Sequence, residues 1–143
     1  MKKIILLLMV IIIGVFFVVG SKRVKESRDL QNKYKDFSII NYKLEGNNYK
    51  LLLADSSERW ERGLMNFRSL EGVDGMIFIF PNKEIRNFWN KNTLMDLELL
   101  WIDGDKIVGR SELPSIEKSK EIVNVQSQKP VDKVIELPTL DKR

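Results

Sequence analysis

An uncharged apolar run near the N-terminus most constrains what this chain can fold into. It extends from Ile4 to Gly20, follows Lys2-Lys3 and precedes Ser21-Lys22-Arg23. At about 1.5 Å per residue, a helix of this length spans roughly 25 Å, close to the hydrocarbon thickness of a bilayer. We therefore expect residues 1–20 to form a single-pass anchor in the cell membrane, with residues 4–20 in contact with the membrane.

A cleaved signal peptide is the alternative reading of the same segment. Val18 and Gly20 offer a weak cleavage site before Ser21, and cleavage after Gly20 would release a secreted protein. Basic residues flank both ends of the run, so the positive-inside rule leaves the orientation ambiguous. A short basic leader is also how exported chains begin, so we place the rest of the chain outside the cytoplasm.

The formal net charge of +4 is concentrated beside the apolar run. Residues 29–143 contain 18 basic and 19 acidic groups and so have no basic excess. Nucleic-acid binding requires such an excess, and we expect no nucleic-acid partner. The chain contains neither Cys nor His, which excludes thiolate and imidazole chemistry and Cys/His zinc sites. We expect no metal and no cofactor.

The remainder divides into a tether and one domain. Residues 21–36 are charged and show no hydrophobic face, which indicates a tether between membrane and domain. From residue 37 onward the pattern predicts a mainly β fold, α+β at most, as an antiparallel sandwich or a partly open barrel over residues 37–143. One short helix is expected near residues 56–62, capped by Asp55 and ended by Gly63. Short apolar segments predict strands at 37–44, 49–54, 75–80, 85–90, 97–102, 106–110, 121–125 and 133–137.

Three segments occur in a characteristic order: GLMNFRSL (63–70), GMIFIF (75–80) and FWNKNTLMDLELLWID (88–103), followed by VIEL (134–137). With them the chain resembles the family called domain of unknown function 192, over about residues 51–137. The resemblance implies a small, mainly β protein of a kind often exported or membrane-anchored in bacteria and archaea. It implies no reaction, because the molecular function of that family is not established.

The chain departs from the family pattern at several positions. Asn90 stands where Met is usual, Asp96 where Pro is usual and Glu98 where Asp is usual. A C-terminal segment of the family is absent, because the sequence stops at Arg143. We expect this truncation to leave a free sheet edge, or one that a partner covers.

The polar residues after Phe88 form the main candidate ligand-binding site. Trp89 offers an aromatic surface, and Lys91, Asn92 and Thr93 offer ammonium, amide and hydroxyl groups, a composition typical of a site for a polar ligand. The alternative is that Asn92 and Thr93 only shape a turn. Arg68 completes the candidate set, either as a ligand for an anionic group or as the ion-pair partner of Glu58 or Glu61.

Asp96 and Glu98 form the one carboxylate pair with a plausible catalytic interpretation. Two residues apart in a strand, they would share a face, where like charges could raise one pKa. The alternative is that they form the wet face of a strand whose buried face contains Leu97, Leu99 and Trp101. Asp103 and Asp105 flank a turn glycine and are interpreted as hairpin residues.

Three functional hypotheses follow. The first is a membrane-tethered, extracytoplasmic domain that binds an envelope polymer or protein through the Trp89–Thr93 region. The second is a carboxylate-dependent hydrolase that uses Asp96 and Glu98. The third is a structural subunit that pairs through its truncated edge. The absence of a recognisable catalytic arrangement favours binding over catalysis.

Overall fold

The computed structural model describes residues 19–139, which fall into two units that meet between Asp36 and Phe37. In the first unit, residues 19–33 are helical, so most of the segment interpreted as a tether is helix. Within the described residues, no helix has the length and apolarity needed to cross a membrane. Nearly all of the predicted anchor, residues 4–20, lies outside the described part of the chain.

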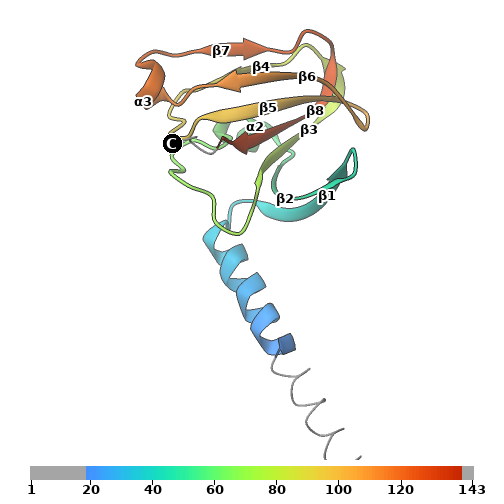
Figure 1. Cartoon of the computed structure of the whole chain (residues 1–143), viewed down its shortest axis with the longest axis vertical. Coiled ribbons are helices and arrows are strands. Elements are labelled where there is room, and N and C mark those ends of the chain that lie inside the picture. Colours follow the sequence, from blue (N-terminus) through green and yellow to red (C-terminus); the bar gives the residue numbers. More distant parts are fainter. Residues whose placement is uncertain (1–18, 140–143) are drawn as a thin grey trace, which may run out of the picture. The chain divides into compact units, whose positions relative to one another are not determined.

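The second unit is mainly β, as predicted (Figure 1). Two short helices, α2 (Ser57–Arg62) and α3 (Ile116–Ser119), interrupt the strands. The strands are β1 (Ser38–Leu44), β2 (Asn47–Ala54), β3 (Gly75–Glu84), β4 (Asn87–Trp89), β5 (Leu97–Asp103), β6 (Lys106–Leu113), β7 (Asn124–Gln126) and β8 (Val131–Pro138).

Six strands form one mixed sheet in the order β1-β2-β3-β8-β5-β6, and β4 pairs with β7 in a separate ribbon. Every pair in the large sheet is antiparallel except β2–β3, which is parallel. The sheet is therefore mixed, and the antiparallel arrangement that was predicted does not hold at this pair. The physical reason is that α2 and residues 63–74 lead the chain back before β3 begins, as parallel pairing requires.

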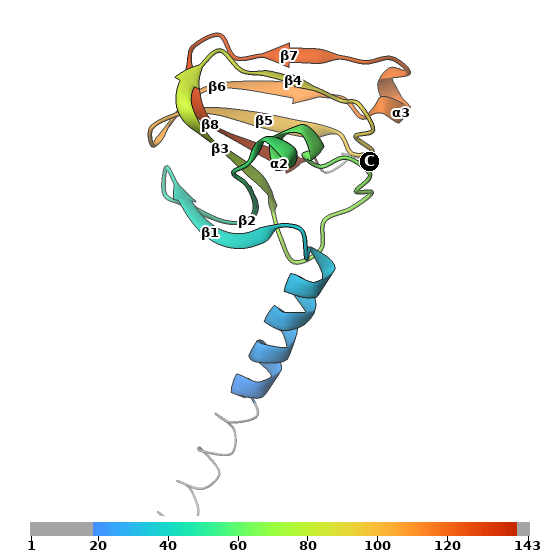
Figure 2. The ribbon, with the colours of Figure 1, turned by 180° about the vertical axis from the view of Figure 1, so that it is seen from behind.

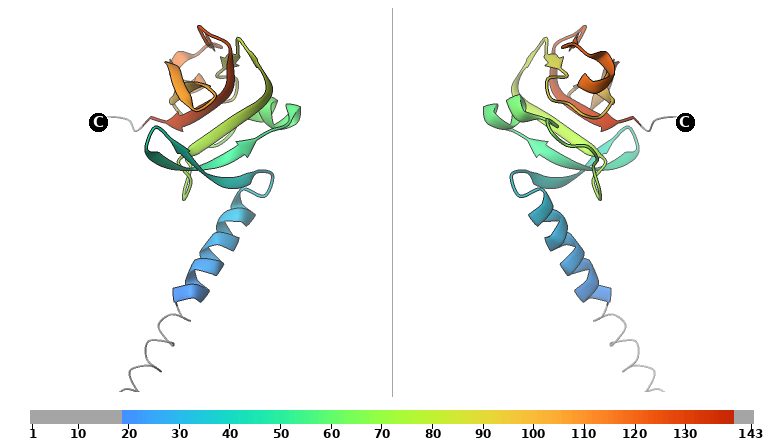
Figure 3. Two further views of the ribbon diagram at one scale, coloured as in Figure 1. Left: turned by 90° about the vertical axis from the view of Figure 1, so that its right-hand side faces the viewer. Right: turned by 90° about the vertical axis from the view of Figure 1, so that its left-hand side faces the viewer.

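The sheet curves strongly without closing into a barrel (Figure 3). At one corner the two ends of the sheet approach each other, because Glu45 Oε1 accepts a hydrogen bond from the Ile107 N–H at 3.0 Å. The last strand, β8, lies between β3 and β5 and pairs with both. Among the described strands of this sheet, the edges are β1 and β6, so any free edge lies at one of these strands and not at β8.

The short helix α2 begins at Ser57, one residue later than expected, and its N-cap is also one residue later. Ser56, rather than Asp55, is the N-cap, and its hydroxyl accepts a hydrogen bond from the Arg59 N–H. Asp55 instead forms an ion pair with the Arg59 guanidinium at 2.6 Å. Gly63 ends the helix at a φ of 46°, a positive value that glycine adopts with little strain. Figure 2 shows α2 in front of the sheet, over β3 and β8.

The two faces of the sheet differ in what they bury. One face packs a cluster of aliphatic side chains, which comprises Leu44, Leu51, Ile77, Leu100, Ile102 and Ile135. Side chains alternate along each strand, so the neighbouring residues point to the opposite face, which presents Met76, Phe78, Leu99 and Glu136. This second face lies beneath α2 and contains the one acidic side chain among the buried residues that the structure describes.

Candidate functional site

A buried carboxyl group lies at the centre of the second sheet face. Glu136 on β8 is opposite Met76 on β3 and opposite Leu99 on β5, both of which are fully buried. Only 4% of Glu136 is exposed, and its Oε2 has no hydrogen-bond partner within residues 19–139. Buried polar atoms in folded proteins are nearly always paired, so this oxygen requires an explanation.

The environment of Glu136 changes its acidity. Burial among apolar neighbours raises the pKa of Glu136 to about 8, because the charged form loses its hydration. The carboxyl group is therefore mainly protonated at neutral pH. A neutral carboxylic acid can both donate and accept a hydrogen bond, which suits a binding or proton-transfer site.

A small cavity of about 20 Å³ adjoins Glu136. This volume accommodates about one water-sized group. Aromatic rings form much of its wall, where Phe88 packs edge-on against Phe78 with ring centroids 4.8 Å apart. Phe88 also packs edge-on against Trp101, which does not line the cavity, at 5.6 Å. The lining residues are Trp60, Glu61, Arg62, Gly63, Leu64, Met65, Phe78, Phe88, Trp89, Thr93 and Glu136.

Gly63 contributes to the space in front of the carboxyl group. A methyl group on its Cα would lie 3.4 Å from Phe78 Cζ and 3.9 Å from Glu136 Oε2. The turn that ends α2 thus passes directly over the buried acid. The cavity brings together the three segments that support the family resemblance, because it takes residues from 63–70, 75–80 and 88–103 in addition to β8.

The predicted Trp89–Thr93 site lies at the rim of this cavity. Trp89 is 39% exposed, and the Lys91 ammonium lies 4.9 Å from the centroid of its ring. Thr93 is buried and lines the cavity with Trp89. Asn92 has a φ of 55°, and its carbonyl accepts a hydrogen bond from the Asn66 N–H at 2.9 Å. Its backbone therefore shapes a turn that joins this loop to the chain after α2.

Asn90, noted above only as a departure from the family pattern, is fully buried and holds the loop in place. Its Nδ2 donates hydrogen bonds to the Pro114 carbonyl at 2.9 Å and to Ser119 Oγ at 2.8 Å. Its Oδ1 accepts one from the Val123 N–H at 2.8 Å. The Asn90 carbonyl also accepts from the Thr93 N–H at 3.0 Å. The amide therefore fixes the position from which Trp89 and Thr93 reach the cavity.

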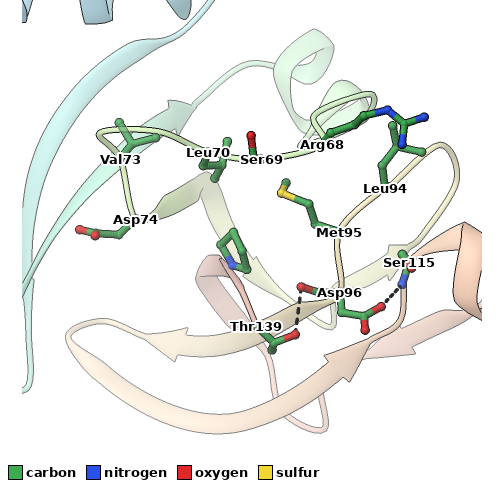
Figure 4. Close-up of a pocket in the computed structure, with 11 residues that line it drawn as sticks. Arg68, Ser69, Leu70, Val73, Asp74, Leu94, Met95, Asp96, Ser115 and Thr139 are labelled. Carbon is green, nitrogen blue, oxygen red and sulfur yellow. Dashed lines mark hydrogen bonds between the residues drawn. The ribbon is translucent and has the colours of Figure 1, made fainter. Parts of the chain in front are cut away.

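Arg68 lies elsewhere, at a second and larger depression of about 490 Å³ (Figure 4). The walls of this depression combine apolar and polar residues, and its charged side chains are already paired. Arg68 forms an ion pair with Glu117 at 3.3 Å, and Asp74 accepts a hydrogen bond from the Lys50 N–H at 2.7 Å. The structure therefore separates Arg68 from the Trp89–Thr93 set, and its acidic partner is Glu117 instead of the expected Glu58 or Glu61.

Asp96 lines the same depression, but Glu98 does not. Asp96 accepts hydrogen bonds from the Ser115 N–H at 2.7 Å and from the Lys118 ammonium at 2.8 Å, and both lower its pKa, Lys118 the more strongly. Glu98 forms an ion pair with Arg110 at 2.8 Å. Each carboxylate thus has a cation of its own, whereas the hydrolase hypothesis needs their like charges to raise one of the two pKa values.

Sequence reasoning missed Glu136 as a site residue. It lies in an apolar strand, VIEL, where a single acid is normally taken to point towards solvent. One signal was available: Val134 shares a face with Glu136 and is apolar, and a near-continuous apolar run is typical of a strand buried on both faces. Among the described residues, no group of three or more Asp or Glu side chains could hold a metal ion. In the turn that contains Asp103 and Asp105, Asp103 forms an ion pair with Lys83.

Comparisons with known proteins agree with this fold. Residues 40–139 match the model of the DUF192 family, described as Uncharacterized ACR. A crystal structure of a putative transcription regulator from Sinorhizobium meliloti 1021 is 27% identical, with a TM-score of 0.57 over 72% of this chain and 82% of the other. A protein of unknown function from Novosphingobium aromaticivorans DSM 12444 is 20% identical, with a TM-score of 0.57 over 71% and 73%. No curated protein matches the chain.

Proposed function

The chain belongs to the DUF192 family, and we propose that it is a membrane-tethered, extracytoplasmic domain that binds an envelope polymer or protein at the Glu136 cavity and its rim. One observation supports this most strongly. An exposed tryptophan, Trp89, lines a cavity whose buried acid, Glu136, has an oxygen without a hydrogen-bond partner among the described residues. An aromatic surface beside an unpaired polar group is the usual composition of a recognition site.

The membrane part of the proposal rests on the sequence. The apolar run 4–20 and its basic flanks are those of an anchor or an export signal. Mass spectrometry of the mature N-terminus tests the two readings. We expect an uncleaved chain in the membrane fraction, and a new terminus at Ser21 would show a secreted protein instead.

Nucleic-acid binding is a weaker reading, although one similar structure is named as a transcription regulator. Residues 29–143 have a formal charge of −1, with 18 basic and 19 acidic groups. DNA-binding domains owe much of their affinity to cations that neutralise phosphates. The composition of this domain therefore favours a different partner.

Binding at the rim is tested with the full chain in detergent micelles and insoluble cell-wall sacculi as the probe. We expect the wild-type protein to sediment with the sacculi, and Trp89→Ala to lose most of that capture. Ile85→Ala is the matched control, because Ile85 is a similarly exposed apolar residue, 42% exposed, that does not line the cavity. Equal capture of the two variants would contradict a binding role for the rim.

Lys91 is tested in the same assay. Lys91→Ala removes the ammonium that lies over the Trp89 ring. We expect reduced capture with an unchanged melting temperature, because exposed side chains typically contribute within about 0.5 kcal/mol to stability. Lys106→Ala on the exposed start of β6 is the control for loss of one positive charge. If both lysine variants lose capture equally, the effect is one of net charge and not of the site.

A further inference from the structure

We propose that the cavity beside Glu136 is a subsite for a primary ammonium group of the ligand, an inference that rests on the proposed function. The cavity is about 20 Å³, which fits a group of one heavy atom such as an ammonium head. A guanidinium group has four heavy atoms in a plane and exceeds that space. The subsite would therefore hold only the terminal ammonium group of a ligand, and the rest of the ligand would contact Trp89 at the rim.

The buried acid requires a hydrogen-bond donor. Glu136 Oε2 accepts no hydrogen bond from the described residues, and its cross-strand neighbours, Met76 and Leu99, have no side-chain donor to offer. The other charged residues that line the cavity are Glu61 and Arg62. The Arg62 guanidinium lies 5.2 Å from the centroid of the Phe37 ring. The missing partner is thus a group that a ligand would bring.

The walls favour a cation over a neutral donor. The faces of aromatic rings attract cations, and Phe78, Phe88 and Trp89 surround the cavity. The protein itself already places one primary ammonium, that of Lys91, over the Trp89 ring at 4.9 Å. A bound ammonium would also compensate the charge of an ionised Glu136, which a hydroxyl group cannot do.

Charge compensation makes the binding proton-linked. The empty site retains a proton on Glu136, whose pKa burial raises to about 8. A bound ammonium stabilises the carboxylate, so this proton leaves to solvent when the cation enters below that pH. Affinity for the ammonium should therefore rise as the pH increases towards 8. Glu61 and Arg62, which line the same cavity, have opposite charges and so oppose each other's influence on this equilibrium.

The first test uses methylammonium chloride as the probe and the full chain in detergent micelles. The readout is the titration of the Glu136 carboxyl carbon by NMR in protein labelled at glutamate. We expect saturating methylammonium to lower the proton affinity of Glu136 at least about tenfold, because an opposite charge at short range lowers a carboxyl pKa by 1–3. Tetramethylammonium chloride is the control, since it has the same charge and no N–H donor.

Equal effects of the two salts would overturn the proposal, because only methylammonium has N–H donors and a head small enough for a cavity of about 20 Å³. Glu136→Gln provides a second measurement through tryptophan fluorescence, because both Trp60 and Trp89 line the cavity. We expect methylammonium to change this fluorescence in the wild type and not in Glu136→Gln. If the variant does not fold, the comparison of the two salts on the wild-type protein still decides the question.

The source of the ammonium is tested with two matched pairs of ligands. Chitosan and chitin tetrasaccharides differ in bearing amines or acetamides on the same glycan, and a lysine peptide and its Nε-acetyl form differ likewise. We expect the amine form of one pair to bind at least about tenfold more tightly, and that advantage to vanish in Glu136→Gln. No advantage in either pair would overturn the ammonium subsite. Loss of sacculus capture in Trp89→Ala would still support the rim, so the two proposals can fail separately.

Discussion

Asn90 and Val123 are joined by two hydrogen bonds, one from each backbone N–H. The Asn90 N–H donates to the Val123 carbonyl at 3.2 Å, and the Val123 N–H donates to Asn90 Oδ1 at 2.8 Å. The second bond replaces a backbone acceptor with a side-chain amide at the point where β4 ends and the pairing with β7 stops. One side chain thereby joins the candidate site to the segment that follows α3.

We predict that Asn90→Ala destabilises the domain by at least about 2 kcal/mol. The change leaves the Val123 N–H without its acceptor, and each unsatisfied buried group costs about 1–3 kcal/mol. Thermal unfolding followed by circular dichroism measures the effect, which amounts to several degrees for a domain of this size. Asn90→Met should also destabilise this chain, because it too removes the acceptor.

Asn41, an exposed residue on β1, provides the control substitution. Asn41→Ala should change the melting temperature by no more than a degree or so, since an exposed side chain contributes little. If Asn90→Ala were equally harmless, the amide would not hold the loop as the hydrogen bonds indicate.

Most strands could be predicted from the sequence because each one buries an alternating or continuous apolar face. Strand pairing was less predictable. The apolar pattern of the β3 segment GMIFIF does not indicate whether its partner strand is parallel or antiparallel. The parallel pairing with β2 depends on the path of the chain through α2, between the two strands. Gly75 shows the same limit, since a Cβ there would lie 2.0 Å from the Glu136 carbonyl oxygen, a contact visible only once β3 and β8 are side by side.

The candidate site was predictable in part, for a similar reason. Trp89 and Thr93 were identified because their residue types suit a ligand, and the structure brings both to one cavity. Arg68 does not line this cavity. Its position in the sequence did not predict this, because residues far apart in the chain can lie close together or far apart in the fold. Glu136 could not be recognised from its own segment, because its burial depends on two neighbouring strands and on α2 above it.

The role of Asn92 can be separated from that of its neighbours. Its φ of 55° lies in the left-handed region, which Asn tolerates and Ala does not. We predict that Asn92→Ala destabilises the domain by about 1 kcal/mol, whereas Asn92→Gly leaves the melting temperature unchanged or slightly raised. If the Asn92 side chain contacts the ligand, Asn92→Gly should still lose capture of sacculi. Unchanged capture would assign Asn92 to the turn alone.

The ion pair of Asp96 should make stability depend on acid pH. The Lys118 ammonium and the Ser115 N–H hold the pKa of Asp96 below its usual value of 3.8. A lowered folded-state pKa contributes stability above the unfolded-state value, and this contribution is lost as the pH falls through the folded-state pKa. Asp96→Asn should therefore lower the melting temperature at neutral pH, with the difference from wild type shrinking below about pH 4.

Glu98→Gln is the matched control for Asp96→Asn. Glu98 forms one ion pair with an exposed arginine, Arg110, and such surface pairs contribute about 0–1 kcal/mol. Asp96 in addition accepts the Ser115 N–H, so its replacement should cost more than that of Glu98. Equal losses in the two variants would mean that the Ser115 hydrogen bond adds nothing.

Glu136 should have the opposite pH dependence, because its pKa is raised in the folded state. The unfolded chain releases the proton near pH 4.5, whereas the folded chain retains it to about pH 8. Between these values the unfolded state binds fewer protons, so the free energy of unfolding falls as the pH rises, by up to about 1.4 kcal/mol per pH unit.

Glu136→Gln removes this titration. We predict that the variant melts at a higher temperature than wild type near about pH 8, with the difference disappearing near about pH 4. Thermal melts at both pH values measure it, with Glu112→Gln, an exposed carboxyl on β6, as the control that should follow wild type at both. A difference between Glu136→Gln and wild type that stayed constant with pH would show that the carboxyl group titrates normally, and the cavity would then contain no buried acid in need of a partner.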